Sequence, residues 1–374
     1  MKLSKQWLLP LCLIAGHRII VWLMLVVSIF GWGDIDRRNF EIAMQSWPRT
    51  GGPVFLSHFA TWDTAHYLHL SEEGYAAGDP SCAFYPLWPH WIRWTAPNEG
   101  AWHLVVGTIW ANLFSFIAIH IFYRVVLFRY GDETAKWAMV MLLVYPGTLF
   151  FMFHYSESLF FVLLMILCWA CQHQRLGWAT AAAFLLPLTR SVGVFAVVPL
   201  TWGMCGKGFS RHNAWVVIAP ILGWGGYLLW MQLLTGNPWE GFEAQRFWSV
   251  NSISNLFQPA KFLSAFAYPL VFHDYYGSVL DRTFWLLFLW SLPFVWGLDR
   301  EWFWWVLLLG IVPGVLSSLV SFMRYSVMAF PVFVLWGAII SRSRYGALRW
   351  LVVAVMVAIQ VSLSWRHVNF LWAG

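Results

Sequence analysis

Long apolar runs recur along this chain of 374 residues, and they constrain its fold more than any other feature. A membrane-spanning helix needs about 20 apolar residues in succession. Charged residues make up 11% of the sequence, less than half of the share of about 25% that is usual in soluble domains. Most of the surface must therefore face lipid, which predicts a polytopic membrane protein. The predicted spans are 7–32, 102–128, 135–153, 157–173, 213–235, 283–298, 302–320, 325–341 and 346–365.

A further apolar stretch, 177–203, is interrupted near its middle by Arg190. Two half-helices, 177–189 and 191–203, would each be roughly 20 Å long, which is too short to cross a bilayer alone. Broken backbone is tolerated inside a membrane where it is buried in protein or lines a polar cavity. We therefore expect a re-entrant hairpin with Arg190 near its apex. The alternative is one long tilted helix from which Arg190 reaches the surface.

Two long polar stretches, 33–101 and 236–282, each follow a predicted span. If the N-terminus is cytoplasmic, both stretches lie outside, and the short connections place their basic residues in the cytoplasm, as the positive-inside rule requires. The expected fold is an all-α polytopic bundle of about ten spans, with one broken hairpin and short amphipathic helices in its external loops. We treat residues 1–374 as a single domain. The basic residues in question are Arg124, Arg129, Lys136, Arg175, Lys207, Arg211, Arg300, Arg342, Arg344 and Arg349.

The first external stretch holds a short helical pattern, because Asp63, His66 and Tyr67 follow i, i+3, i+4 spacing. We expect an amphipathic helix that lies at the membrane surface and ends at Gly74. Two interpretations of Asp63 stay open, since a carboxylate at a first turn either favours the helix dipole or serves catalysis. The proline-rich segment 82–92 that follows is predicted to be a rigid apolar loop.

Charged residues also stand at the predicted outer ends of later spans. A carboxylate at the position of Glu157 is costly unless it is hydrated or partnered, although a helix-start role competes. Arg190 and Arg324 lie on the same predicted side, and arginine recognises phosphate with a planar fork of donors. The pair indicates a site for a lipid phosphate, and ordinary headgroup contact is the alternative.

Several functions are disfavoured by what the sequence lacks. It contains no phosphate-cradling glycine motif and no H-E-x-x-H. Cys168 and Cys171 form a C-x-x-C inside an apolar run without zinc spacing, so we expect no metal and no cofactor. Asp34 and Asp36 form a D-x-D on the predicted outer side, where nucleotide sugars are scarce. The basic residues form no stripe, which disfavours nucleic acid.

Taken together, these segments resemble the PIG-V family, the GPI mannosyltransferase 2 type of GT-C membrane glycosyltransferase, in a short bacterial-looking form. They occur in order over residues of about 60 to 331. The matching residues are Trp62, Asp63, His66 to Leu68, Glu73 to Tyr75, Ala83 to Leu87, Pro89, Tyr145, Pro146, Tyr155 to Phe160, Leu188 to Ser191, Gly193, Thr235 to Pro238, Gln245, Trp248, Arg324, Tyr325, Phe330 and Pro331.

The resemblance implies a GT-C fold, a polyprenyl-phosphate donor that typically carries mannose, and an extracytoplasmic active site, which we expect in a bacterial inner (plasma) membrane. Asp63 matches the family's loop aspartate and is the expected general base, with Glu157 as a second candidate. We assign Arg190 and Arg324, and more weakly Arg246, to the leaving phosphate. Transfer would be inverting, and the partners would be membrane lipids and a lipid or glycan acceptor.

The remaining motif residues are expected to bind substrate. His66 departs from the family pattern, where an aromatic residue such as Trp is expected. Two other functions stay open, namely a lipid-linked sugar transporter or flippase and a non-catalytic subunit of a glycan assembly complex. The expected substrate-binding residues, besides the arginines, are His66, Tyr67, Glu73, Tyr85, Gln245, Trp248 and Tyr325.

Overall fold

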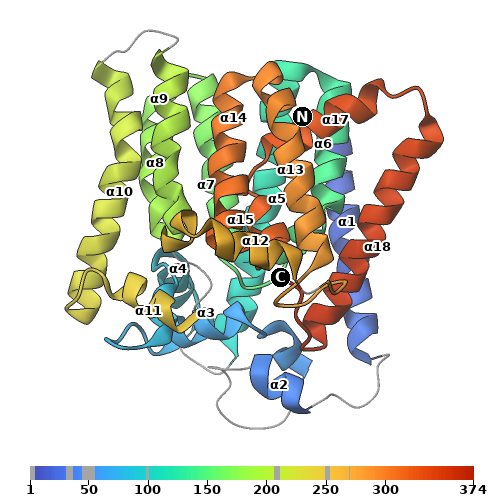
Figure 1. Ribbon diagram of the computed structural model, residues 1–374. Coiled ribbons are helices and arrows are strands. Elements are labelled where there is room, and N and C mark those ends of the chain that lie inside the picture. The colour runs from blue at the N-terminus through green and yellow to red at the C-terminus, as the bar shows by residue number, and fades with distance from the viewer. Residues whose placement is uncertain are drawn as a thin grey trace.

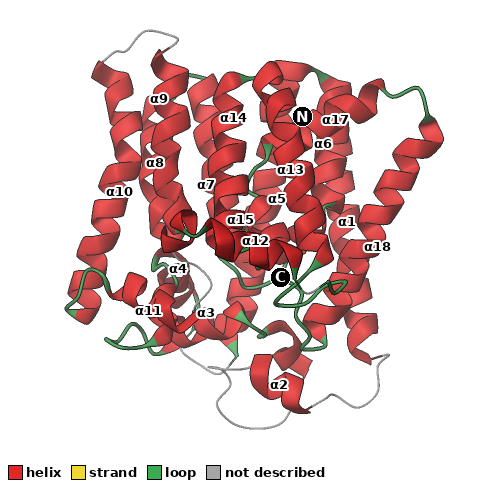
Figure 2. Cartoon of the chain, viewed as in Figure 1, coloured by secondary structure: helices red, strands yellow, loops and turns green. Residues whose placement is uncertain are grey.

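The computed structural model describes residues 5–30, 37–43, 55–97, 101–205, 211–248, 253–268 and 270–374. Within these residues the regular structure is helical, apart from one isolated bridge between Val271 and Ser278. Figure 2 shows the long helices side by side, with loops gathered at their two ends. The predicted all-α class is therefore confirmed.

Among the described residues, five helices are long and apolar enough to cross a membrane. They are α1 (Lys5–Phe30), α5 (Trp102–Tyr130), α10 (Arg211–Thr235), α13 (Val279–Leu298) and α18 (Gly346–Val368). Shorter apolar helices stand among them in Figure 1. These are α7 (Glu157–Gln172), α8 (Leu176–Thr189), α9 (Val197–Cys205) and α17 (Pro331–Arg342). The chain is thus a membrane protein, while the count of about ten spans stays a prediction.

Three predicted spans contain shorter helices than their apolar sequence predicts, and in one of them, 325–341, helix α17 begins only at Pro331. The predicted span 135–153 is α6 (Asp132–Val144), which ends because Pro146 cannot continue it and instead begins the 3₁₀ helix η3 (Pro146–Phe151). The predicted span 302–320 is helical only as far as Leu316. Its pieces are α14 (Arg300–Val306), the π-helical turn η6 (Leu307–Ile311) and α15 (Val312–Leu316).

The stretch 177–203 is broken at Arg190, as the sequence predicts. Helix α8 ends at Thr189, Arg190 has extended backbone (φ −157°, ψ 142°), and the 3₁₀ helix η4 (Ser191–Ala196) leads into α9. Gly193 permits this turn, because a Cβ on it would lie 2.4 Å from the Leu186 carbonyl carbon. Both halves pack against η4 and α10, and Arg190 lies at the turn between them.

The short helices of the two polar stretches are α2 (Arg37–Ala43), η1 (Phe55–Phe59), α3 (Asp63–Glu72), η2 (Pro80–Ala83), α4 (Leu87–Thr95), α11 (Glu240–Trp248), η5 (Ile253–Phe257) and α12 (Pro259–Ala267). Of these helices, α2, α3, α4 and α11 lie at the lower end of the bundle in Figure 1, and α12 lies near mid-height at its front. Gly74, with φ +92°, follows α3 as expected. The loop predicted for 82–92 is wrong, because Pro86 and Pro89 fall at the start of α4, where a helix tolerates proline.

Candidate active site

Asp63 opens α3 and points its carboxylate across the bundle instead of capping its own helix. No side-chain hydrogen bond caps this helix end, and Asp63 Oδ2 lies 2.6 Å from Arg324 Nη2. The preceding residue, Trp62, has an unusual backbone (φ 57°, ψ −127°), and its N–H donates to the Ala43 carbonyl at 2.8 Å. Such strain persists only where surrounding contacts impose it, and here it sets the direction of α3.

Arg324 lies on the short helix α16 (Phe322–Ser326), which a strained turn leads into. Ser318, Leu319 and Ser321 all have positive φ, between 50° and 68°. The buried Asp281 of α13 accepts the Met323 N–H at 2.9 Å through Oδ1, so it holds the backbone beside Arg324. This anchoring fixes the arginine that reaches both carboxylates of the site.

Glu157 joins the two arginines at the start of α7. Its Oε1 accepts from Arg324 Nε and lies 2.7 Å from Arg190 Nη1. Arg190 also donates to Ser156 Oγ at 3.3 Å, and that hydroxyl shares a 2.7 Å hydrogen bond with Tyr67 Oη. We call Asp63, Glu157, Arg190 and Arg324 the charged cluster; its two carboxylates and two guanidinium groups balance in formal charge.

The members of the charged cluster differ in their access to ligand. The side chains of Glu157 and Arg324 are 0% and 3% exposed, whereas those of Arg190 and Asp63 are 17% and 23% exposed. Aromatic rings cover the buried part, since the Arg324 guanidinium lies 4.5 Å from the Tyr155 ring centroid. Asp63 and Arg190 are therefore the two most accessible side chains of the charged cluster.

Tyr67 and Tyr325 also belong to this region, as the sequence predicts. The Arg190 guanidinium lies 5.3 Å from the Tyr325 ring centroid, a cation–π distance. Burial raises the pKa of Tyr67, and the charge of Glu157 adds to the rise. Tyr67 is therefore a neutral hydroxyl that can donate a hydrogen bond beside the charged cluster.

His66 lies on α3 but packs away from the charged cluster. Its ring stacks on Phe84 at 5.0 Å and meets Trp248 edge-on at 4.9 Å, while Nδ1 shares a 3.0 Å hydrogen bond with Ser81 Oγ. Burial lowers the pKa of His66 to about 4, so the ring is neutral near pH 7. His66 therefore supports α3 by packing beneath it. Its side chain is 4% exposed, which leaves almost none of its surface for contact with a substrate.

Four further predicted residues lie outside the charged cluster. Gln245 Nε2 donates to the Ala83 carbonyl at 3.2 Å, and Trp248 Nε1 to the Pro80 carbonyl at 3.5 Å, so both attach α11 to the first polar stretch. Arg246, between them, is exposed. Glu73 is exposed at the far end of α3, about 15 Å along the helix from Asp63.

Tyr85 is buried near the hairpin apex. Its ring stacks on Tyr227 of α10 at 4.2 Å, and its hydroxyl is hydrogen-bonded to the side chain of Ser191, directly after Arg190. The structure thus brings Tyr85 close to the arginine without exposing it. Nothing in the sequence indicated that Ser156 or Asp281 belongs to the site, although Ser156 stands next to Glu157 in a segment that matches the family.

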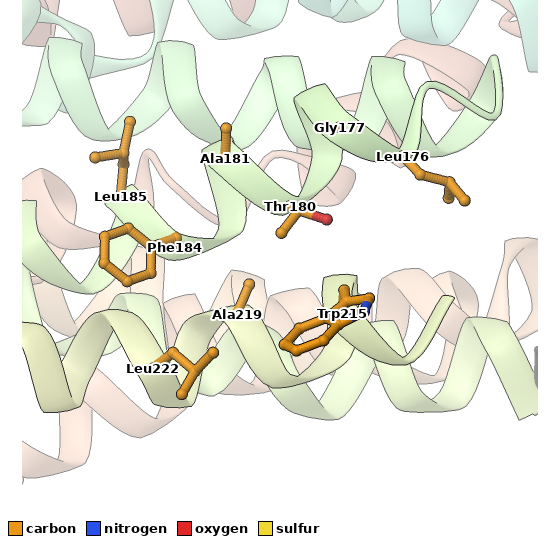
Figure 3. Close-up of a pocket in the computed structure, with 9 residues that line it drawn as sticks. All are labelled: Leu176, Gly177, Thr180, Ala181, Phe184, Leu185, Trp215, Ala219 and Leu222. Carbon is orange, nitrogen blue, oxygen red and sulfur yellow. The ribbon is translucent and has the colours of Figure 1, made fainter. Parts of the chain in front are cut away.

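An apolar groove of about 630 Å³ runs between α8 and α10. Figure 3 shows Trp215, Ala219 and Leu222 of α10 facing the side chains of α8 across it. Trp215 is 62% exposed, so the groove lies on the outer face of the bundle. Its α8 residues lead along the helix toward Arg190. The groove is lined by Leu176, Gly177, Thr180, Ala181, Phe184, Leu185, Trp215, Ala219 and Leu222.

In the described ranges, no group of three or more His, Cys, Asp or Glu side chains is arranged to hold an ion. Asp34 and Asp36 fall outside those ranges.

Comparisons with known proteins agree with the family suggested by the sequence. The family model described as mannosyltransferase (PIG-V) matches residues 53–214. That match includes Asp63, Glu157 and Arg190 and ends before Arg324. No curated protein matches this chain. The resemblance to PIG-V is therefore confirmed over the part of the chain that contains three members of the charged cluster.

Solved structures of a membrane glycosyltransferase share the fold. The oligosaccharyltransferase of Archaeoglobus fulgidus in its apo form is similar with a TM-score of 0.50 and 9% identity, over 99% of this chain and 57% of that chain. The same enzyme tethered to an acceptor peptide gives 0.45 and 11%, over 97% and 56%. This chain thus spans little more than half of the length of that enzyme. At such identity the likeness shows the GT-C fold alone.

Proposed function

With residues 53–214 identifying this chain as a relative of the PIG-V mannosyltransferases, we propose that it transfers mannose from a polyprenyl-phosphate donor to a hydroxyl group of a lipid or glycan acceptor. One observation carries the proposal. Within the charged cluster, Asp63 is the more exposed carboxylate and Arg190 is the more exposed guanidinium. Arg324 and Glu157 join these two residues into one charge-balanced site.

Asp63 is the proposed general base. The acceptor oxygen attacks C1 of the donor sugar, the bond between C1 and the phosphate oxygen breaks, and the acceptor proton passes to the Asp63 carboxylate. Arg324 engages Oδ2, which leaves the second carboxylate oxygen to accept the proton. A single displacement of this kind inverts the anomeric centre.

Arg190 is the proposed first contact of the leaving phosphate. The phosphate gains negative charge as the C1–O bond breaks, and a positioned guanidinium stabilises that charge most where water is excluded. Arg190 is the more exposed of the two arginines, and Tyr325 and Ser156 hold it from two sides. Arg324 is more deeply buried, and its positive charge acts on the same phosphate through its contacts with Glu157 and Asp63. Arg246 is exposed on α11 and keeps a weaker role in this proposal.

The groove between α8 and α10 is the proposed path of the prenyl chain. Its lining is apolar, and it opens on the outer face of the bundle, where lipid chains lie. Leu185 is five residues before Arg190, which is about 8 Å along a helix. A lipid in this groove would bring its phosphate to the hairpin apex while its tail stayed among apolar side chains.

We assign the active site to the extracytoplasmic side of a bacterial inner membrane. Helices α2, α3, α4 and α11 of the polar stretches lie at one end of the bundle (Figure 1), and Asp63 begins α3 there, while the connections at the other end are short, such as Gly131 alone between α5 and α6. A cytoplasmic N-terminus with basic short connections satisfies the positive-inside rule.

The direct test uses the purified protein in lipid nanodiscs with polyprenyl-phosphate [³H]mannose and, separately, GDP-[³H]mannose. A membrane glycolipid extract serves as acceptor. We expect a labelled product from the lipid donor alone, and a loss of about 100-fold or more in Asp63→Asn, which keeps the side-chain shape but removes the base.

Two results would contradict this function. Near-normal transfer by a folded Asp63→Asn protein would remove Asp63 from the chemistry. Uptake or counter-flow of the labelled donor without any covalent product would make the protein a transporter. Glu133→Gln, the same loss of a carboxylate at a side chain that is 74% exposed in the first turn of α6, is the control and should leave transfer unchanged.

A further inference from the structure

Helix α12, in the second polar stretch, lies at the surface of the protein over its whole length. None of its nine residues is buried, whereas α3 buries seven of its ten. The exposed side chains on α12 and beside it are large and apolar, since Phe257 is 80% exposed and Leu263 is 64% exposed. We call these side chains the α12 surface, which consists of Leu256, Phe257, Leu263, Tyr268, Leu270 and Phe272.

Contacts with α13 hold α12 in this position. Phe262 and Phe266 pack on the ring of Trp285, with centroids 5.2 and 6.2 Å away. The buried Arg282 donates through Nη2 to the Ala265 carbonyl at 2.7 Å. Carbonyl groups in the last turn of a helix have no partner within it, so Arg282 completes the end of α12. The exposed face of α12 is therefore a fixed part of the fold.

The segment that carries the α12 surface has almost no charge. Between residues 253 and 273, Lys261 is the one Lys, Arg, Asp or Glu, and the other charged residues of the second polar stretch lie in 240–246 and 274–282. The Lys261 ammonium group donates to Asn255 Oδ1 at 2.8 Å. A contiguous exposed apolar surface marks a contact with lipid or with another protein. Aromatic side chains beside a lysine are typical of a helix that lies in the interface of a membrane.

The surface next to α12 favours lipid as the partner. α13 is one of the helices that are apolar enough to cross a membrane, and α12 packs on its second turn through Trp285. Leu289 lies one turn beyond Trp285 on the same face of α13, and both Leu289 and Trp290 are exposed. Figure 1 shows α12 near mid-height at the front of the bundle, above α3 and α11. The α12 surface thus continues the face of α13 that meets lipid.

We propose that the α12 surface is inserted among the acyl chains of the nearer membrane leaflet, with α12 parallel to the plane of the membrane. The partner is the phospholipid bilayer itself. A helix of this kind sinks its apolar face about 5–10 Å into the boundary between headgroups and acyl chains. Lys261, the exposed cation of the segment, would then meet the phosphate groups of that leaflet. The inference concerns residues outside the charged cluster and does not depend on the proposed transferase function.

Photocrosslinking in phospholipid nanodiscs tests the insertion. p-Benzoylphenylalanine is introduced in place of Phe257 or of Leu263, the protein is irradiated, and intact-mass spectrometry measures the fraction that gains the mass of one phospholipid. The same group in place of Trp290, on the exposed face of α13, is the positive control, and in place of the exposed Glu73 it is the negative control. We expect yields at positions 257 and 263 within about twofold of the yield at 290 and at least about fivefold above the yield at 73.

A charged variant provides the second measurement. Leu263→Glu places a carboxylate in the acyl-chain region, so the lipid yield from position 257 should fall by about threefold or more. The yield from position 290 should stay the same, which shows that the variant is still folded in the bilayer. Yields at 257 and 263 no higher than at 73, or an unchanged yield in Leu263→Glu, would overturn the insertion. A covalent dimer formed in place of the lipid adduct would also overturn it and would identify a second copy of this chain as the partner.

Discussion

Arg324 donates through Nε to Glu157, 167 positions earlier in the chain, and through Nη2 it pairs with Asp63 at 2.6 Å. One guanidinium thus holds both carboxylates of the site. A fork of donors can do this because its N–H groups point in fixed, diverging directions, whereas an ammonium group acts as a single charge.

Replacing Arg324 by lysine should therefore separate charge from geometry. Arg324→Lys keeps the positive charge but cannot bridge Asp63 and Glu157 at once, so we expect kcat to fall by at least about tenfold. Initial rates across donor and acceptor concentrations measure the effect. Arg342→Lys, an equal change at the end of α17, is the control, and equal activity in the two variants would argue against the bridging role.

Arg190 should govern donor binding more than acceptor binding. Arg190→Gln removes a partly exposed guanidinium from the proposed phosphate site and leaves Glu157 with Arg324 as its remaining partner. We expect the donor KM to rise by about tenfold or more, with a smaller effect on the acceptor KM. The measurement is the same two-substrate kinetic analysis. A parallel rise in both constants would point to a structural role at the hairpin apex.

Asp281 should act by positioning Arg324 through the Met323 N–H. Asp281→Asn keeps a carbonyl oxygen for that hydrogen bond, whereas Asp281→Ala leaves the N–H without its acceptor. We expect the alanine variant to lose more kcat than the asparagine variant, with KM values nearly unchanged. Partial rescue by asparagine identifies the hydrogen bond as the cause, and equal losses would contradict it.

Gly147 should be intolerant of a side chain for a related reason. A Cβ on Gly147 would lie 2.0 Å from the Met323 carbonyl oxygen, a backbone atom next to Arg324. Gly147→Ala must push α16 aside, so we expect lower thermal stability, by a few kcal/mol, together with lower transfer. Gly297→Ala on α13 is the matched control, because nothing lies within 4 Å of its added Cβ. Thermal melts of both variants by tryptophan fluorescence give the comparison.

His66 should make stability depend on pH. Its folded pKa of about 4 lies below the usual value of 6.5, so between these values the unfolded chain binds the proton and the folded protein does not. Above about pH 6.5 the titration of His66 therefore does not lower the free energy of unfolding. This free energy declines as the pH falls toward 4, by on the order of 2 kcal/mol at pH 5. His66→Phe should show a smaller drop in Tm between pH 7 and pH 5. An identical drop in the two proteins would show that His66 contributes nothing to it.

The family motifs in the sequence located Asp63, Glu157 and Arg190 but did not show how they meet. Glu157 stands at the start of an apolar run and Arg190 interrupts another, and an ionisable group at such a position is costly unless it has a partner. This cost indicates that such a residue has a partner, but it does not predict which residue the partner is. The structure names the partners: Glu157 takes both arginines and Asp63 takes one.

The local errors have local causes. Pro86 and Pro89 indicated a loop, yet the first turn of a helix has no need of the N–H that proline lacks, so α4 forms there. In the reverse case, Pro146 ended α6 inside a continuous apolar run. Hydrophobicity reports that a segment is buried or faces lipid, and it does not report whether the backbone stays helical.

What the sequence by itself determined is the class of the molecule and the break at Arg190, because apolar length and a charge inside it are properties of contiguous residues. Only the tertiary structure decided that Trp372 and Tyr275 stand beside Trp62, and that Arg324 bridges two carboxylates. Those contacts join residues far apart in the chain. Helical periodicity carries information over a few turns, whereas the meeting of distant segments depends on how every helix packs.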